Sequence, residues 1–188
     1  MEMPFERVIV AVVIIAFAFE RLANTFCTPR VRLLDAALEK RESRFTAVML
    51  MLYSVCVIGS VYLYFNSIVR TYLLAYLSGI SLLVGGCLLR RRAISSMGCN
   101  WSVSTLANSV TAVVQNGPFK ISRHPYYWAS FLELVGVSVF LHSVFGVLFS
   151  VFVYFPLLVY RSILEEKDLN RKFPLVYEKY KTQVNFFV

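Results

Sequence analysis

The sequence predicts an all-α polytopic membrane protein with about five transmembrane helices, and three observations lead to this class. Hydrophobic residues make up 58% of the 188 positions, and the mean hydropathy is +0.64, which is more apolar than one soluble core of this length requires. Several stretches approach about 20 apolar residues, the length of a helix that crosses the hydrocarbon layer with its backbone satisfied. Basic residues gather in some connections and are scarce in others. We expect one membrane-embedded domain over residues 1–188.

The first three spans are expected at residues 8–26, 45–65 and 72–89. Glu20 and Arg21 interrupt the first of them, and no small-residue cleavage site precedes the basic loop that follows. We therefore interpret this stretch as a mature helix and not as a cleaved signal.

The last apolar run, from Tyr126 to Tyr160, is too long for one span. As a single helix it would cover about 50 Å, whereas the hydrocarbon layer is about 30 Å thick. A polar interruption at Leu141–Ser143 leaves a helix of reasonable length on either side. The sequence therefore predicts a helical hairpin with spans at residues 126–141 and 144–163.

Positive charge assigns the two faces, since Lys and Arg collect on the cytoplasmic side. Most basic residues fall on one predicted face, and only Arg7 and Arg70 fall on the other. We predict an N-terminus outside and a C-terminus in the cytoplasm. The net charge of +8 then reflects topology, and no nucleic-acid module is visible. Clusters such as Arg90–Arg92 are interpreted as anchors at anionic headgroups, with substrate binding as the alternative.

The cysteines give no indication of a metal or a disulfide framework. Cys27, Cys56, Cys87 and Cys99 are irregularly spaced and form no paired-cysteine motif. We expect no metal site.

Two polar segments, at about 90–125 and 161–183, are expected to lie on the cytoplasmic face. The first contains Asn116-Gly117-Pro118, which is turn chemistry, and enough apolar residues to fold over the membrane surface. The second carries a stripe of apolar and aromatic residues spaced three and four positions apart, as on one face of a helix. Pro174 is expected to start or kink a short helix there. The members of the stripe are Leu169, Phe173, Val176, Tyr177 and Tyr180. This stripe either packs the tail against the membrane domain or stacks on a cofactor.

The hairpin brings together two motifs that are distant in the sequence. A helix that leaves the face after Arg123-His124-Pro125 and a second that returns must bring Glu165-Glu166 back to that face. Because acidic residues contribute little to orientation, this combination indicates a polar site. The alternative is capping and salt bridging between helix ends.

These residues belong to a longer pattern. It comprises Gly117-Pro118-Phe119, Arg123-His124-Pro125, Tyr127, Arg161, Glu165-Glu166, Leu169, Phe173, Tyr177 and Tyr180. In order and spacing it resembles the isoprenylcysteine carboxyl methyltransferase-like membrane methyltransferases, which are related to the phosphatidylethanolamine methyltransferases. The resemblance covers roughly the C-terminal half. The chain departs from that family at Phe119, where Tyr is usual, and at Trp128-Ala129-Ser130, where a glycine is usual.

The resemblance implies an S-adenosylmethionine-dependent methyltransferase with its site on the cytoplasmic face. The implied cofactor-binding residues are Gly117, Pro118, Phe119, His124, Pro125, Tyr127, Glu165, Glu166 and Tyr177, and the implied catalytic residues are Arg123, His124 and Glu166. Methyl transfer from a sulfonium needs no metal, only alignment, worth about 7–11 kcal/mol in well-oriented systems. Carboxylates and aromatic faces suit the cofactor's cations, and Arg123 or His124 suits its carboxylate. A role for His124 as general base is the alternative.

The resemblance implies a lipophilic acceptor, either prenylcysteine carboxylate-like or another lipid-like small molecule. Glu133, Arg161 and Trp128 are candidates to border it. Glu133 lies inside a predicted span, where ionisable groups are costly, so Arg21 is expected as its buried partner, with either a functional or a purely structural pairing. Membrane lipids are the other expected partners, in the inner or plasma membrane of a prokaryote or the endoplasmic reticulum of a eukaryote.

Two other functions remain open from the sequence. Membrane sterol and steroid reductases carry a similar Gly-aromatic, Arg-His-Pro, aromatic stretch and use NADPH. Against a reductase stands Glu165-Glu166 followed by the aromatic stripe. A non-catalytic membrane scaffold is the third possibility, and it predicts that changes at His124 or Glu166 affect only stability.

Overall fold

The computed structural model is all-helical over the residues it describes, which are 5–26, 36–66, 72–98 and 112–187. The long helices are α1 (Phe5–Phe26), α2 (Ala36–Asn66), α3 (Leu73–Met97) and α4 (Pro125–Phe140). They are followed by α5 (Val144–Phe149), the π-helical η4 (Ser150–Tyr154), α6 (Phe155–Lys172) and α7 (Pro174–Gln183), and the short 3₁₀ helix η3 (Gly117–Lys120) precedes α4. These ranges contain no strand, only an isolated bridge between Ser122 and Asn185.

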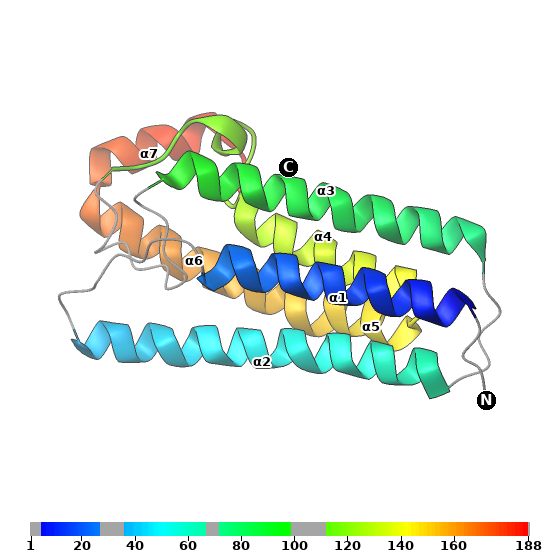
Figure 1. Ribbon diagram of the computed structural model, residues 1–188. Helices are drawn as coiled ribbons and strands as arrows, with labels where there is room; N and C mark the ends of the chain where they lie inside the picture. The colour runs from blue at the N-terminus through cyan, green and yellow to red at the C-terminus, as the bar shows by residue number, and fades with distance from the viewer. Residues whose placement is uncertain (1–4, 27–35, 67–71, 99–111, 188) are drawn as a thin grey trace.

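The long helices lie side by side, and the short ones gather at one end. Figure 1 shows α1, α2, α3, α4 and the α5–α6 segment running lengthwise, with η3 and α7 beside the end where α3 and α6 finish. This end of the bundle is therefore built from segments distant in sequence.

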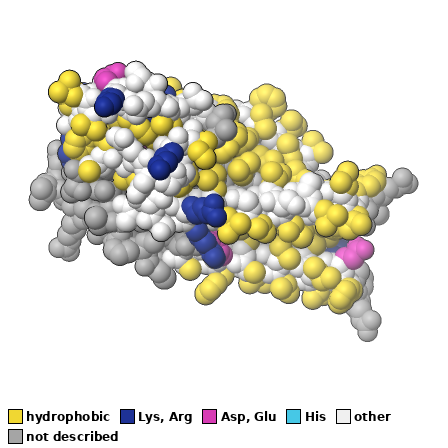
Figure 2. All heavy atoms as spheres, turned by 90° about the horizontal axis from the view of Figure 1, so that it is seen from above, with side chains coloured by type: hydrophobic (Ala, Val, Ile, Leu, Met, Phe, Trp, Pro, Cys, Tyr) yellow, Lys and Arg dark blue, Asp and Glu magenta, His cyan; other side chains and the backbone are white. Residues whose placement is uncertain are grey.

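Three helices in the described residues are long and apolar enough to cross a membrane, namely Arg44–Asn66, Leu73–Met97 and Val144–Lys172. Large apolar side chains such as Leu74 and Ile58 point outward from them. Figure 2 shows apolar side chains over much of one face and basic side chains toward the end that holds α7. The expected spans at 8–26 and 126–141 correspond to α1 and α4.

The last long helix contains a wider turn where the sequence requires one. α5, η4 and α6 follow one another without a break, and η4 lies immediately before the turn that contains Pro156. Proline lacks the N–H that an α-helix needs and crowds the carbonyl four residues earlier. A single π turn relieves that conflict and keeps the helix continuous.

Glycines allow α3 and α4 to pack closely. A Cβ atom on Gly136 would lie 2.9 Å from the backbone nitrogen of Leu83, and one on Gly79 would lie 2.6 Å from the backbone nitrogen of Phe140. Small residues let membrane helices approach until their backbones touch. The tight pairing fixes the position of α4 along α3.

The hairpin turn lies at the residues where the sequence predicted it. His142 adopts a φ of 52°, and the Ser143 N–H donates to the Ser138 carbonyl at 2.8 Å. The Gly146 N–H donates to Ser143 Oγ at 3.0 Å, which caps the next helix. Hydrogen bonds within the turn therefore satisfy the backbone N–H groups of Ser143 and Gly146.

The third helix continues two turns beyond the predicted end at residue 89. It carries Arg90, Arg91 and Arg92 as helical residues, so the expected polar segment 90–125 begins inside this helix. Residues 99–111 of that segment lie outside the described residues, as do Cys27, Cys99 and Arg70. Cys56 and Cys87 are free thiols.

Candidate functional site

The start of α4 and the end of α6 bring two charged motifs into contact. His124 Nε2 lies 3.1 Å from Glu166 Oε1, and Arg123 Nε lies 3.2 Å from the same oxygen. His124 is buried, whereas Arg123 and Glu166 are largely buried. The juxtaposition expected from the hairpin is therefore present.

The second carboxylate is held by a separate set of contacts. The Tyr127 hydroxyl donates to Glu165 Oε2 at 2.8 Å, and Arg161 Nε donates to the Tyr127 oxygen at 3.2 Å. Tyr127 lies one turn after His124 on α4, and their rings stack at 5.8 Å between centroids. Adjacent glutamates on α6 are thus oriented by different neighbours.

The turn before α4 is shaped by Gly117. This residue has a φ of 57°, a conformation that favours glycine, and a Cβ atom there would overlap the Ser96 side chain. Pro118 stands in the first turn of η3, and the buried Phe119 receives a 2.7 Å hydrogen bond on its carbonyl from the Tyr180 hydroxyl. α7 is therefore tied directly to η3.

A small cavity lies among these elements. Its volume is about 50 Å³, below the roughly 300–1,000 Å³ of sites that enclose a whole small molecule, so in this arrangement it takes only part of a ligand. Its lining includes Met97, Phe119, Arg123, His124, Glu165, Leu169, Tyr177 and Tyr180. Burial and the charges of Glu166 and Glu165 raise the pKa of Tyr177 well above its ordinary value. The Tyr177 phenol is therefore neutral at physiological pH.

The C-terminal residues cover the site, which sequence reasoning missed. The Arg123 N–H donates to the Asn185 carbonyl at 3.1 Å, and the Phe186 ring lies 4.9 Å from His124 and 5.3 Å from the Arg123 guanidinium. Phe187 stacks on Trp128 at 5.7 Å. Two consecutive aromatic residues shortly after the predicted C-terminal helix, Phe186 and Phe187, were the available signal.

The predicted acceptor residues fall into separate places. Arg161 belongs to the site through Tyr127, whereas Trp128 lies in an aromatic group with Phe131 and Phe187. Glu133 is six residues after Tyr127 on α4, which places it about 9 Å further along the helix axis at 1.5 Å per residue. The structure therefore places Arg161 beside the carboxylates, and Glu133 and Trp128 apart from them.

Glu133 is the centre of a buried charge cluster. It pairs with Arg21, as the sequence predicted, and also with Arg90. Glu133 is 0% exposed and Arg90 is 1% exposed, so the prediction that Arg90 anchors at lipid headgroups is wrong. The reason is helix register: Arg90 lies one turn after Gly86, which faces Glu133. Arg91, 58% exposed, pairs with Glu20 at 3.0 Å.

The chemistry of the site fits S-adenosylmethionine. The carboxylates of Glu165 and Glu166 complement a sulfonium and an ammonium group, and Arg123 complements a carboxylate. Aromatic faces and apolar walls, including Tyr177, suit the remainder of such a ligand. Within the described ranges, no group of three or more His, Cys, Asp or Glu side chains is arranged to hold a metal ion.

Comparison with known protein families gives a match over much of the chain. The family model for phospholipid methyltransferases matches residues 74–175, which is 102 of the 188 residues and more than half of the chain. The match runs from the start of α3 into α7 and includes every contact between α4 and α6 described above. No curated protein and no solved structure matches the chain.

Proposed function

The chain belongs to the phospholipid methyltransferase family, and we propose that it uses S-adenosylmethionine to methylate a lipophilic acceptor. The family match bears out the resemblance in the C-terminal half, and the apolar helices make the chain an integral membrane protein. The observation that carries the proposal is the contact of Glu166 with both His124 and Arg123. The acceptor is proposed to be prenylcysteine carboxylate-like or another lipid-like small molecule.

We place the site on the cytoplasmic face of a single five-span domain. The spans are α1, α2, α3, α4 and the α5–α6 helix, with the N-terminus outside. The basic residues toward the end of the bundle that holds α7 support this orientation. The cytoplasmic segments are then 90–125 after the third span and 161–183 after the last.

The residues have distinct roles in binding. Glu165 and Glu166 hold the cationic groups of the ligand, and Arg123 holds its carboxylate, since charge-assisted hydrogen bonds are the stronger ones. Gly117, Pro118 and Phe119 form one wall. Pro125, at the first helical position, fixes the start of α4 so that Tyr127 faces Glu165.

The remaining requirement is alignment. When bound, S-adenosylmethionine supplies a methyl group activated by its sulfonium. The protein's task is to hold this group and the acceptor in line, which His124 and Tyr127 serve by fixing the two carboxylates. His124 thus has a positioning role, and an acceptor that is already ionised needs no general base. The neutral Tyr177 contributes an aromatic face.

Calorimetric titration with S-adenosylhomocysteine tests the proposal. The detergent-purified wild type should bind it, and Glu166→Gln should bind about tenfold to a hundredfold more weakly, because a hydrogen bond to a charged group contributes about 1.5–3 kcal/mol. Glu178→Gln is the matched control, because Glu178 on α7 is exposed and forms a surface ion pair with Lys181. It should bind like the wild type.

A parallel titration with NADPH separates the reductase alternative. The wild type should show no NADPH binding under conditions in which S-adenosylhomocysteine binds. Binding of NADPH alone would overturn the proposal. Binding of neither would favour a non-catalytic role.

A further inference from the structure

The segment that follows α7 turns back onto the candidate site. The Arg123 N–H donates to the Asn185 carbonyl at 3.1 Å, and Ser122 Oγ donates to the Phe186 carbonyl at 3.3 Å. Ser122 and Asn185 also form the isolated bridge. We call Asn185, Phe186 and Phe187 the aromatic strap. The strap lies beyond the residues matched by the family model, so the family assignment gives it no role.

A group of aromatic rings holds the other end of the strap. Phe187 stacks on Trp128 of α4 at 5.7 Å between centroids, and its ring lies 5.7 Å from that of Phe155 on α6. Aromatic pairs at such distances are favourable in addition to the area that they bury. Together with the backbone hydrogen bonds, these contacts fix the position of Phe186 relative to the start of α4.

Phe186 contacts the two basic side chains that meet Glu166. Its ring lies 5.3 Å from the Arg123 guanidinium and 4.9 Å from the His124 ring. Each of those side chains has a nitrogen within 3.2 Å of Glu166 Oε1. Arg123 and His124 line the cavity, and Phe186 is not among its described lining residues. The Phe186 ring therefore contacts the basic pair without occupying the space that a ligand would take.

Contact with an aromatic ring suits the function proposed for Arg123. A guanidinium is planar, and its N–H groups point outward in that plane. A ring placed over the guanidinium carbon attracts the cation and leaves the N–H groups at the edge available for Glu166 and for a carboxylate of the ligand. A side chain held in this way loses less conformational entropy on binding than a mobile one.

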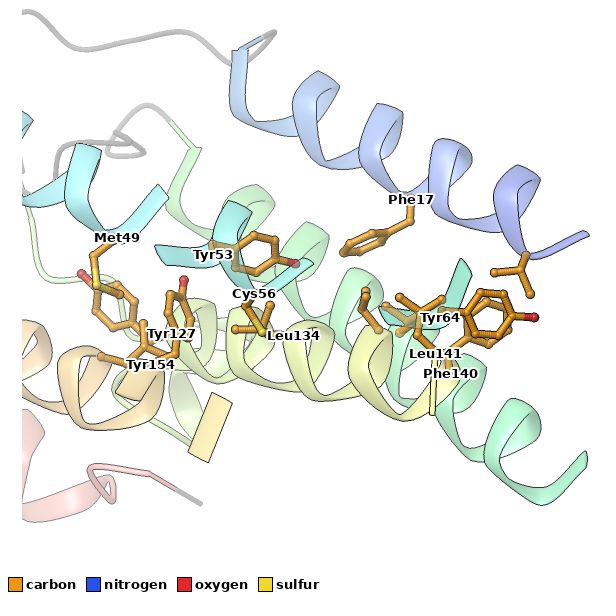
Figure 3. Packing of buried hydrophobic residues seen from close by; sticks show 14 residues of the cluster. Phe17, Met49, Tyr53, Cys56, Tyr64, Tyr127, Leu134, Phe140, Leu141 and Tyr154 are labelled. Atoms are coloured by element: carbon orange, nitrogen blue, oxygen red, sulfur yellow. The ribbon is translucent and has the colours of Figure 1, made fainter. Parts of the chain in front are cut away.

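Two aromatic rings hold the His124 imidazole. It stacks on Tyr127 at 5.8 Å and contacts Phe186, and its Nε2 atom meets Glu166. Tyr127 is itself fixed, because it belongs to one buried cluster with Tyr154 (Figure 3). The two rings therefore determine the direction in which Nε2 points.

Resting on the proposed methyltransferase function, we propose that Phe186 is a positioning residue of the site. Its ring holds Arg123 ready for the carboxylate of S-adenosylmethionine and keeps His124 Nε2 directed at Glu166. Phe187 anchors the strap among the aromatic rings of α4 and α6. Affinity for the amino-acid part of the cofactor thus depends on a segment outside the matched family region.

Two ligands distinguish positioning from a merely structural role. S-adenosylhomocysteine carries the carboxylate that Arg123 is proposed to hold, whereas methylthioadenosine has the adenosine and the sulfur but no carboxylate. In calorimetry, Phe186→Leu should bind S-adenosylhomocysteine about fivefold more weakly through loss of the cation–π contact, and should bind methylthioadenosine as the wild type does. Phe186→Tyr keeps the aromatic ring and should bind both ligands like the wild type.

Phe149→Leu is the matched control. Phe149 is likewise half-buried, but it packs against Phe145 on α5, so this variant should bind both ligands normally. Equal weakening of both ligands in Phe186→Leu would overturn the proposal, because it would show general damage to the site. Unchanged affinity of Phe186→Leu for S-adenosylhomocysteine would overturn it as well.

A measurement without cofactor separates this proposal from the one on which it rests. The chain has two histidines, His124 and His142, and diethyl pyrocarbonate modifies an imidazole where reagent can reach it. Phe186→Ala should raise the modification rate of the buried His124 about fivefold, since a buried group reacts through local opening, with His142 as the internal reference. Should Phe186→Ala not fold, Phe187→Ala removes the anchor and should give the same increase.

The outcomes for the two proposals are distinct. A wild type that binds neither ligand would overturn the methyltransferase proposal, while the reactivity of His124 would still show whether the strap holds this side chain. An unchanged rate at His124 in the strap variants would overturn the positioning role, even where the wild type binds S-adenosylhomocysteine.

Discussion

Replacing Glu133 with glutamine tests the buried charge cluster most directly. The substitution keeps the shape of the side chain and removes its charge, which leaves Arg21 and Arg90 together without their shared carboxylate. Since Glu133 is 0% and Arg90 1% exposed, water does not compensate for the loss. Removing one partner of a buried ion pair costs about 3–5 kcal/mol. At about 2–4 °C per kcal/mol for a chain of this size, Tm should fall by about 6–20 °C.

Thermal unfolding in detergent, followed by the fraction that still elutes as a single species, measures this change. Arg91→Gln is the control, because the exposed Arg91–Glu20 pair is of the kind that contributes about 0–1 kcal/mol. Its Tm should stay within about 4 °C of the wild type. If Glu133→Gln and Arg91→Gln unfold at the same temperature, the cluster does not stabilise the bundle as argued.

Three further predictions concern packing and titration. Gly136→Val should lower the free energy of unfolding by about 1–3 kcal/mol, because the added side chain overpacks against α3. Gly85→Val is the control and should be nearly neutral, because no atom lies within 4 Å of its Cβ position. Chemical unfolding in detergent compares the two variants. Gly117→Ala should weaken binding of S-adenosylhomocysteine in calorimetry, because its positive φ and the nearby Ser96 both exclude a Cβ atom; unchanged affinity would contradict the proposed wall. Burial raises the pKa of Tyr180 to about 12, so the wild type should be equally stable up to about pH 10 and lose stability as pH rises toward 12. Tyr180→Phe should show a smaller loss over that window in pH-dependent melting curves, and an identical loss would contradict this assignment.

The parts of the fold that depend on local pattern were predictable. The turn at Leu141–Ser143 followed from one polar interruption in a run too long for one span, and α7 begins at Pro174, where proline chemistry places a helix start. The return of Glu165-Glu166 to the face that holds His124 also followed from the hairpin, and the structure places Glu166 against His124. These features require only sequence spacing and the thickness of a membrane.

The parts that depend on rotation between helices were not predictable. Arg90 is the first of three consecutive arginines, so the local sequence resembled a headgroup anchor. Only the rotation of α3 relative to α4 turns the Arg90 side chain toward Glu133. The contact of Phe186 with His124 likewise depends on how α7 is seated. A single sequence contains the identities of these residues but not the relative orientation of their helices.

The hairpin at His142 ends α4 before it has crossed the full thickness of a bilayer. α4 has 16 residues, about 24 Å of helix, which is shorter than the roughly 30 Å hydrocarbon layer. In the proposed topology the hairpin therefore lies below the outer surface, which its internally bonded backbone permits. No residue of α4 is exposed, because α3 and other longer helices cover it. The hydrophobic mismatch that a short lipid-facing helix would impose on a bilayer is therefore taken up inside the protein.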